Sequence, residues 1–332
     1  MSRCSLVAVL LLAAASSAYA ETVEPAEEGI IGGTAAPAGK WPDAVAVLGA
    51  SGSCTGTLIA PDVVLTAGHC ADANPTRVIA NTTNYNGTGG VTANVKSITA
   101  YPNWESTYDV SVIVLATPIT TVTPRKLGTA CTFEGFASGK QVHLVGFGST
   151  DPAGGGTNTL LNEVMAPVTD PTCTTGAGCV AAIAPGGEFV VGGNNKDTCY
   201  GDSGGPVYLD TPRGAVVIGA VSRGLDGTAR PCGDGGIYVR TDKVAQWIET
   251  TTGKQVSKDL CAASGPGTGT GTGGGTGGGT GGGDGTGGGA GTDDGAVDVT
   301  GGCAAGGGAG GAGALAPLGL GLALAARRRR RR

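Results

Sequence analysis

Short runs of aliphatic and β-branched residues, separated by glycine, proline and asparagine, fill the chain from Ile30 to about Ala263. They include TLIA, VVLTA, RVIA, VSVIVLA, HLVGFG, VVIGAVS and GIYVR. Runs of this length and content at this spacing are typical of an all-β sandwich or barrel. About 230 residues is enough for one large β unit or for two small barrels.

One helix is expected after the last of these runs, in the sequence DKVAQWIETT. Its apolar residues Val244, Trp247 and Ile248 fall on one face, and Thr241 or Asp242 is suited to cap its first turn. The pattern therefore predicts an all-β fold that ends in a short helix.

The first 29 residues have the features of an export signal followed by a pro-segment. Arg3 gives a positive start, Leu6 to Ala15 is apolar, and Ala18-Tyr19-Ala20 matches a cleavage site for small residues. Residues 1–20 are therefore expected to be a signal peptide. Residues 21–29 are mostly polar and lack a core-forming pattern, which indicates a pro-segment.

Cysteine content and charge limit the compartment and the partners. Ten cysteines are present, and eight of them lie between Cys54 and Cys261. An even number in an exported domain predicts disulfides, because thiols meet an oxidising environment after translocation. No cluster of metal-ligating residues stands out, so neither metal nor cofactor is expected. The balance of 21 Lys and Arg against 26 Asp and Glu disfavours nucleic acid as a partner.

The end of the chain changes character. Residues 264–300 are rich in Gly and Thr and are expected to form a flexible linker, because they cannot bury a core. In residues 301–332, Gly301-Gly302-Cys303 precedes an uncharged stretch and six arginines. This tail resembles the myxosortase-type sorting tails of some bacterial surface proteins, which implies cleavage near Cys303 and attachment through that cysteine. A plain membrane anchor is the alternative, since the uncharged stretch is long enough to span a bilayer.

Three short motifs carry residues suited to nucleophilic catalysis. The sequence DTCYGDSGGP places Ser203 between glycines, where a tight turn exposes its hydroxyl and aims backbone N–H groups at one point. A serine hydroxyl needs a base, and His69 in TAGHC offers one. Asp109 in YDVSVIVL directly precedes an apolar run, where an acid can orient that base. The second histidine, His143, lies in a strand-like run and is expected to be packed or at a sheet edge.

In order and spacing these motifs resemble the trypsin/chymotrypsin family of serine proteases. The resemblance covers about 230 residues and implies two packed six-stranded antiparallel β-barrels with a short C-terminal helix. It implies a triad of Ser203, His69 and Asp109, with the N–H groups of Gly201 and Ser203 as the oxyanion hole. By the same resemblance, Ser222 hydrogen-bonds the buried Asp109.

The resemblance also implies activation by cleavage before Ile30. In this family the new ammonium group folds inward and pairs with the aspartate that precedes the nucleophile, here Asp202. A buried carboxylate without a partner costs several kcal/mol, so the site stays poorly formed until the chain is cut. Gly32 and Gly33 provide backbone freedom for the insertion. Gly29 departs from the Arg or Lys of animal zymogens, so another protease or a relaxed processing step is expected to make the cut.

Specificity is expected to depend on Asp197, six residues before Ser203. This position carries a carboxylate at the pocket floor in trypsin-like members, and Gly224 and Gly236 match the two small wall residues. A carboxylate at the base of a narrow pocket favours Arg or Lys. If Asp197 points away, a small or apolar residue is favoured instead. Arg223 departs from the family pattern, which usually has Trp there.

The family frame also suggests how the cysteines pair. The resemblance implies a bridge beside the histidine and one across the specificity pocket. The sequence does not fix how the other four cysteines pair, and a small local loop together with a tie to the end of the C-terminal helix is expected. The expected disulfides are Cys54–Cys70, Cys199–Cys232, Cys173–Cys179 and Cys131–Cys261.

The expected function is therefore a secreted serine endopeptidase that cleaves protein or peptide substrates after Arg or Lys. Its expected partners are an activating protease and machinery that processes the tail, and its expected location is outside the cell or on the cell surface or outer membrane. A surface-displayed binding protein that keeps the protease fold without turnover is the alternative from another class.

Overall fold

The computed structural model describes residues 30–174 and 178–261. The expected signal peptide, pro-segment, linker and sorting tail with Cys303 lie outside the described residues. Within the described ranges, no helix is both long and apolar enough to cross a membrane.

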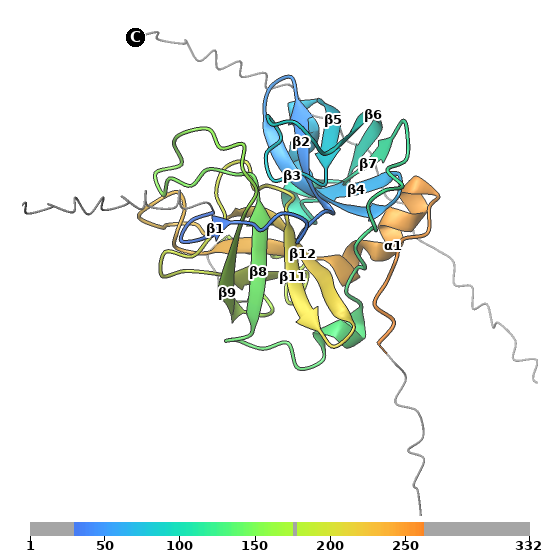
Figure 1. The fold of residues 1–332 in the computed structure, drawn as a ribbon. Coiled ribbons are helices and arrows are strands. Elements are labelled where there is room, and N and C mark those ends of the chain that lie inside the picture. The colour runs from blue at the N-terminus through green and yellow to red at the C-terminus, as the bar shows by residue number, and fades with distance from the viewer. Residues whose placement is uncertain (1–29, 175–177, 262–332) are drawn as a thin grey trace, which may run out of the picture. The chain divides into compact units, whose positions relative to one another are not determined.

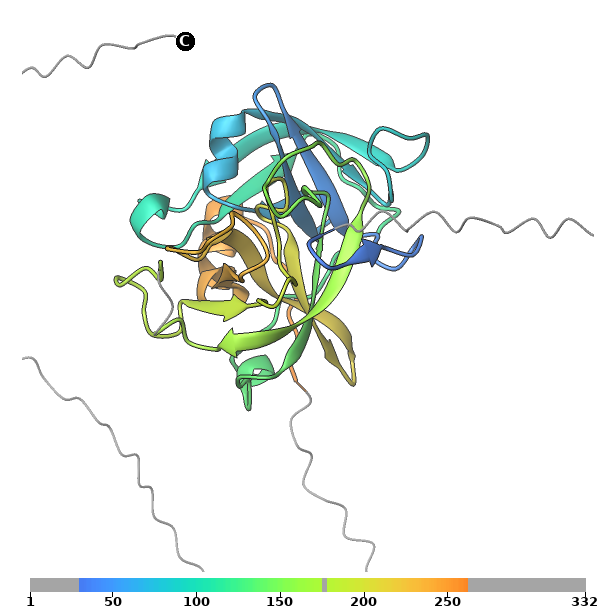
Figure 2. The ribbon, with the colours of Figure 1, turned by 90° about the vertical axis from the view of Figure 1, so that its left-hand side faces the viewer.

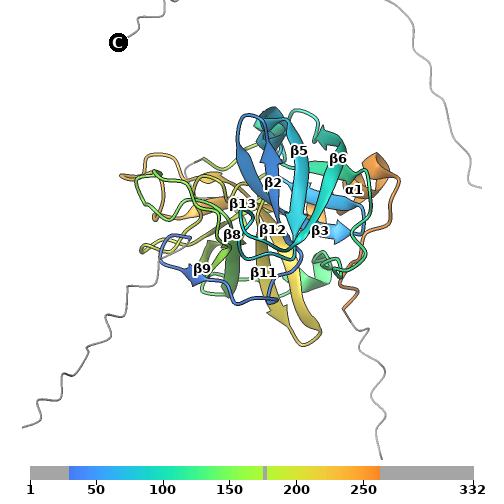
Figure 3. The ribbon, with the colours of Figure 1, turned by 45° about the horizontal axis from the view of Figure 1, so that its top comes forward.

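Six antiparallel strands close into a first barrel in the order β2-β3-β4-β7-β6-β5 (Figure 1, blue to teal). Val45, Leu58, Val64 and Ile113 are fully buried in its core. Figure 3 shows β2, β5 and β6 side by side, as their pairing requires. The strands are β2 (Ala44–Gly49), β3 (Ser53–Ala60), β4 (Val63–Thr66), β5 (Pro75–Ala80), β6 (Val91–Ala100) and β7 (Ser111–Leu115).

The second barrel has the order β9-β10-β13-β12-β11-β8 and is closed by pairing of β8 with β9. Its core contains Leu144, Phe189, Val207 and Tyr238, all fully buried. Figure 2 shows it, in green to orange, packed against the first barrel. The strands are β8 (Gln141–Gly146), β9 (Asn162–Asp170), β10 (Glu188–Val191), β11 (Pro206–Thr211), β12 (Gly214–Gly224) and β13 (Gly236–Arg240), and the short β1 (Thr34–Ala35) pairs with β9.

One α-helix, α1 (Thr241–Thr252), follows β13, so the predicted fold of two six-stranded barrels and a short C-terminal helix is confirmed. Val244 and Ile248 are buried, and the Trp247 ring lies 5.0 Å from the Tyr101 ring of the first barrel. The capping prediction is wrong: α1 begins at Thr241, and its N-cap residue Arg240 makes no side-chain cap. The Thr241 hydroxyl instead donates to a carbonyl of β12, which anchors the helix start to the sheet. The part of the chain that the structure describes also has three short 3-10 helices, η1 (His69–Ala73), η2 (Trp104–Ser106) and η3 (Ala130–Phe133).

A buried ionic cluster joins the barrels on the side of β11. Asp43, directly before β2, is completely buried and is paired with Arg125 from the segment between the barrels. The hydroxyl of Tyr208 in β11 donates to the same carboxylate at 2.7 Å. Trp41 stacks on Tyr208 with ring centroids 4.3 Å apart. One carboxylate therefore holds three segments together, two of them from different barrels.

Replacing Arg125 with methionine is expected to lower the free energy of unfolding by about 3–5 kcal/mol, because it leaves the charge of Asp43 buried without a cation. Urea denaturation with all disulfides intact measures this. Lys126→Met, an exposed neighbour, serves as the control and should cost less than about 1 kcal/mol. An equal loss of unfolding free energy in both variants would show that the ionic cluster does not stabilise the fold.

Candidate active site

Strand pairing brings the candidate base and acid together. Thr66 at the end of β4 pairs with Ser111 at the start of β7. His69 follows the first of these residues, and Asp109 precedes the second. The Asp109 carboxylate contacts His69 Nδ1 at 2.9 Å through Oδ2, and its Oδ1 accepts from the His69 backbone N–H at 3.0 Å. The aspartate therefore holds both the ring and the backbone of the histidine.

Close packing explains the glycines of the two motifs. A Cβ on Gly68 would lie 2.8 Å from both Asp109 Oδ1 and Trp104, so only glycine lets the acid reach the histidine turn. Gly204 has a φ of +77°, and a Cβ there would overlap Thr66 and Ala67. The serine loop is thus pressed directly against the strand that leads to His69.

Hydrogen bonding sets the charge state of Asp109. Burial by itself would raise the pKa of this carboxyl, but hydrogen bonds and the charge of His69, together with a hydrogen bond from Ser222, lower the pKa below its ordinary value. Ser222 donates to Oδ2 at 2.7 Å, the contact that the family resemblance implied. Asp109 is therefore a carboxylate across the neutral pH range and can stabilise a protonated histidine.

A cleft of about 470 Å³ brings the separate motifs together. His69 and Ser203 line it, as do Ser222, Arg223 and Gly224 from the end of β12. His69, Ser203 and the end of β12, the candidate substrate-binding edge, therefore line the same cleft.

Asp197 lies behind the wall of this cleft. It is 1% exposed, whereas its neighbours Thr198 and Cys199 line the cleft. Its carboxylate accepts backbone N–H groups of Thr198, Gly233 and Gly235 at 2.8 to 3.1 Å. Burial raises the pKa of Asp197 to about 6, although these three hydrogen bonds lower it.

Gly236 lies beside Asp197. A Cβ on Gly236 would lie 3.1 Å from Asp197 Oδ1, so this glycine leaves room at the carboxylate. Any larger residue at this position would press against the Asp197 carboxylate and the Tyr238 hydroxyl.

Asp202, directly before the candidate nucleophile, is fully buried. Its carboxylate accepts the backbone N–H groups of Gly148 and Cys199, both at 2.8 Å. Burial raises the pKa of Asp202 to about 7, because these neutral donors do not offset the loss of water. The side chain of Ile30 is completely buried in the second barrel, and its φ of +36° is rare for a β-branched residue. Gly32 has a φ of +69°, and a Cβ there would overlap the Asn195 carbonyl.

The four predicted disulfides are confirmed as Cys54–Cys70, Cys131–Cys261, Cys173–Cys179 and Cys199–Cys232. In the described residues, Cys54, His69 and Cys70 lie close enough to share a metal ion. Because these two cysteines are bonded to each other, neither offers the thiolate that a metal would need.

Outside the triad, His143 lies in the sheet as its strand-like run predicted, and Arg223, which departs from the family pattern, has a buried acidic partner. His143 packs 5.2 Å from the Trp41 ring and contacts Asp210 at 3.0 Å, so it belongs to the sheet and not to the cleft. Arg223 is paired with the buried Glu188, which the sequence did not single out. In the sequence, Glu188 stands out only as an acidic residue at the start of the apolar run EFVV, and this pattern does not predict which residue pairs with it.

Comparison with known proteins identifies the family to which this fold belongs. The family model for trypsin matches residues 30–248. Trypsin Blo t 3 from Blomia tropicalis is 30% identical over 236 residues, covering 68% of this chain and 86% of that protein. A trypsin from Saccharopolyspora erythraea is 31% identical over 229 residues, 64% and 92% of the two chains. Chymotrypsin-like elastase family member 1 from Canis lupus familiaris is 27% identical over 239 residues, 66% and 90%. The chain belongs to the trypsin family of serine proteases.

Proposed function

We propose that this protein is an exported serine endopeptidase in which Ser203, His69 and Asp109 form the catalytic triad. The observation that carries the proposal is the contact of Asp109 with His69 Nδ1 at 2.9 Å, in a cleft that Ser203 also lines. A carboxylate accepts hydrogen bonds and cannot donate, so Nδ1 carries the proton and Nε2 keeps its lone pair. The ring is then a base toward the cleft.

In the proposed reaction the Ser203 oxygen attacks the peptide carbonyl carbon while its proton passes to His69 Nε2. The N–H groups of Gly201 and Ser203 stabilise the oxyanion. The same proton then moves to the leaving amine as the C–N bond breaks, which leaves an acyl-enzyme. Water, deprotonated by His69, attacks the ester carbonyl, and His69 returns this proton to the Ser203 oxygen as the ester C–O bond breaks. Asp109 stays ionised throughout and stabilises the imidazolium.

Activation is proposed to follow cleavage between Gly29 and Ile30. The new ammonium of Ile30 would supply a cation to Asp202, which has only neutral donors among the described residues. The buried carboxylate, its raised pKa and the buried Ile30 side chain support this role. Export through residues 1–20 and processing or anchoring of the tail at Cys303 remain part of the proposal.

Cleavage after Arg or Lys is proposed as the first-pocket preference, with Asp197 as the recognising charge. The small residues Gly224 and Gly236 and the room beside Asp197 Oδ1 support it. A preference for small or apolar residues is the second candidate, because three backbone N–H groups already bind the Asp197 carboxylate behind the cleft wall.

Peptide amides that differ only in the residue before the scissile bond test both candidates. At pH 8 we expect cleavage after Arg and Lys. Between pH 8 and pH 5 we expect the ratio of kcat/KM for Arg over Leu to fall about tenfold, because a carboxyl with a pKa near 6 is about nine-tenths protonated at pH 5. Protonation of His69 affects both substrates alike, so it cancels in the ratio.

Asp197→Asn is the matched control, since it keeps the shape and removes the charge. Its ratio should be low and independent of pH. A wild-type ratio that is low at every pH would favour the small or apolar pocket and leave the triad untouched. A disulfide-complete protein with a free Ile30 that cleaves no peptide would favour the binding-protein alternative.

A further inference from the structure

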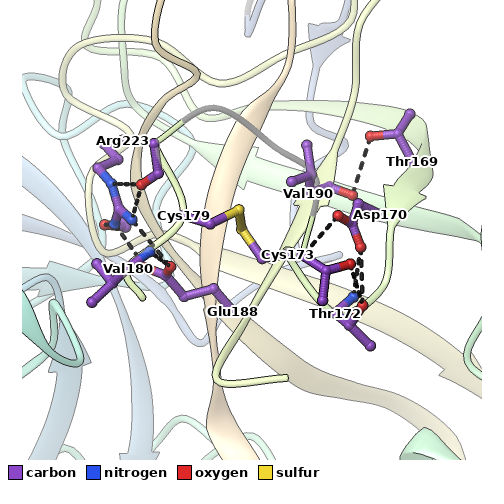
Figure 4. The surroundings of a disulfide bond; sticks show 12 residues. Thr169, Asp170, Thr172, Cys173, Cys179, Val180, Glu188, Val190 and Arg223 are labelled. Carbon is purple, nitrogen blue, oxygen red and sulfur yellow. Dashed lines mark hydrogen bonds and ion pairs between the residues drawn. A yellow bond between two sulfur atoms is a disulfide. The ribbon is translucent and has the colours of Figure 1, made fainter. Parts of the chain in front are cut away.

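Arg223 lines the cleft and contacts Glu188 at the start of β10 (Figure 4). Its Nη1 and Nη2 donate to the two carboxylate oxygens of Glu188 at 2.8 and 3.1 Å. Its Nε and Nη2 donate to the carbonyl of Gly178 at 3.1 and 2.6 Å. Nη1 also donates to the hydroxyl of Ser222 at 2.8 Å. A guanidinium has five N–H groups, and each of them has an acceptor here.

The acceptors that hold Arg223 are themselves fixed. Glu188 begins β10, is 1% exposed and also accepts the N–H of Val180 at 2.8 Å. Gly178 directly precedes Cys179, whose disulfide to Cys173 lies beside Glu188 in Figure 4. The guanidinium is therefore clamped between a buried carboxylate and a disulfide-bonded loop.

A bulge in β12 makes the contact with Ser222 possible. Val221 pairs with Tyr238 and Arg223 pairs with Ile237, so Ser222 is an extra residue opposite β13. Side chains of successive residues in a regular strand point to opposite faces, whereas a bulge redirects one of them. Both side chains can then meet next to Asp109.

The hydrogen bond from Arg223 to Ser222 leaves the Ser222 hydroxyl proton available for Asp109. Arginine has no acceptor atom, so the Ser222 oxygen must accept from Nη1. The single hydroxyl proton is then free to point to Asp109 Oδ2, 2.7 Å away. Asp109 Oδ2 also accepts a hydrogen bond from His69 Nδ1, at 2.9 Å.

We propose that Arg223 is a positioning residue that fixes the Ser222 hydroxyl as a donor to Asp109 and so orients the catalytic acid. Glu188 and the loop of the Cys173–Cys179 disulfide hold Arg223 in place. The inference rests on the proposed peptidase function. It differs from recognition of an acidic substrate side chain by Arg223, because all five N–H groups are already bonded.

Arg223→Met tests the proposal in the protein processed at Ile30. We expect kcat to fall about tenfold, as for loss of one hydrogen bond to a charged group, with KM changed less than about twofold for short substrates. The variant lacks the positive charge of Arg223 and the fixed hydrogen bond from Ser222. Asp109 therefore stabilises the protonated form of His69 more strongly than in the wild type. The acidic limb of the kcat/KM profile should therefore move about 0.5 unit to higher pH.

Arg213→Met is the matched control. Arg213 is 37% exposed and forms a two-point pair with Asp259, which is 1% exposed, whereas the values for Arg223 and Glu188 are 31% and 1%. Loss of either pair should destabilise the fold similarly, but Arg213→Met should leave kcat and the acidic limb unchanged. A loss of activity shared by both variants, with no shift of the limb, would overturn the proposal in favour of a purely structural role.

A double-mutant cycle with Ser222→Ala tests whether Arg223 acts through Ser222. If it does, Ser222→Ala combined with Arg223→Met should be no slower than Ser222→Ala alone, since the two changes remove one shared interaction. Independent, multiplying losses would contradict the proposed route. A defect of Arg223→Met confined to substrates with an acidic upstream residue would instead establish substrate recognition. Arg223→Lys should fold if Arg223→Met does not, and should also lower kcat, because one ammonium cannot serve Glu188, Gly178 and Ser222 together.

Nuclear magnetic resonance gives a readout that does not depend on turnover. In the full chain carrying Ser203→Ala, the ring of His69 can be titrated with and without Arg223→Met. The chain has two histidines, so His143 is an internal reference that should not move. An upward shift for His69 alone supports the proposal even if the protein cleaves no peptide, and an unchanged titration refutes it even if the peptidase function holds.

Discussion

Replacing Ser203 with alanine is expected to lower kcat about 10⁶-fold, as removal of a nucleophile does in serine proteases generally. The oxyanion donors and the substrate contacts remain, so some acceleration over the uncatalysed reaction should persist. The base cannot compensate, because His69 Nε2 would then have only water to deprotonate. Measurement requires active-site titration of the processed protein and initial rates on a peptide amide.

An organophosphonate probe gives the matching covalent readout. It should add once to the wild-type protein, at Ser203, and not at all to Ser203→Ala. Ser138→Ala is a suitable control, because the Ser138 hydroxyl contacts carbonyls of β9 in the second barrel. Labelling that survives in Ser203→Ala would place the nucleophile elsewhere.

Cleavage before Ile30 is expected to raise kcat/KM by about 10³-fold or more relative to the uncut chain. Among the described residues, the Asp202 carboxylate accepts hydrogen bonds only from neutral backbone donors. In the proposed activation, the ammonium created by cleavage would pair with this carboxylate and order the loop that carries Gly201 and Ser203. In the cut protein Asp202→Asn should remove the gain, because the ammonium then has no anion to pair with.

Stability measured against pH gives an independent check on the same carboxylate. In the uncut chain the pKa of Asp202 is about 7, whereas the ordinary value is 3.8. The folded chain therefore binds this proton more tightly than the unfolded chain, so the contribution of Asp202 to stability is most favourable at low pH and becomes less favourable as pH rises from about 4 to 7. The melting temperature of the uncut protein should thus fall more between pH 5 and pH 8 than that of uncut Asp202→Asn. Equal changes in melting temperature in the two proteins would show that the buried Asp202 carboxylate does not destabilise the uncut chain.

The identity of the activating protease can be examined with the same variants. Gly29 does not fit a preference for Arg or Lys, so the protein should not cut itself. Exported Ser203→Ala should then still be found with Ile30 as its N-terminus. Accumulation of the uncut Ser203→Ala chain would instead indicate self-processing.

Much of the site was readable from the sequence because its motifs are local and geometrically strict. TAGHC and GDSGGP contain glycines that the packing of His69, Asp109 and the serine loop requires, so each motif identifies its own neighbourhood. Strand patterns likewise predicted the β fold, and the family resemblance supplied the two barrels and the disulfides. These features depend on residue types within a few positions or on a pattern shared by many sequences.

Tertiary structure alone decided how distant charged groups meet. The pairing of Arg223 with Glu188 spans 35 residues and depends on a bulge in β12 that no residue pattern announces. Asp43 meets Arg125 and Tyr208 because two barrels pack there, and Asp197 lies behind the cleft wall because three loop N–H groups hold it. A side chain's residue type is fixed by the sequence, but its hydrogen-bond partners depend on strand register and barrel packing, which arise when the whole chain folds.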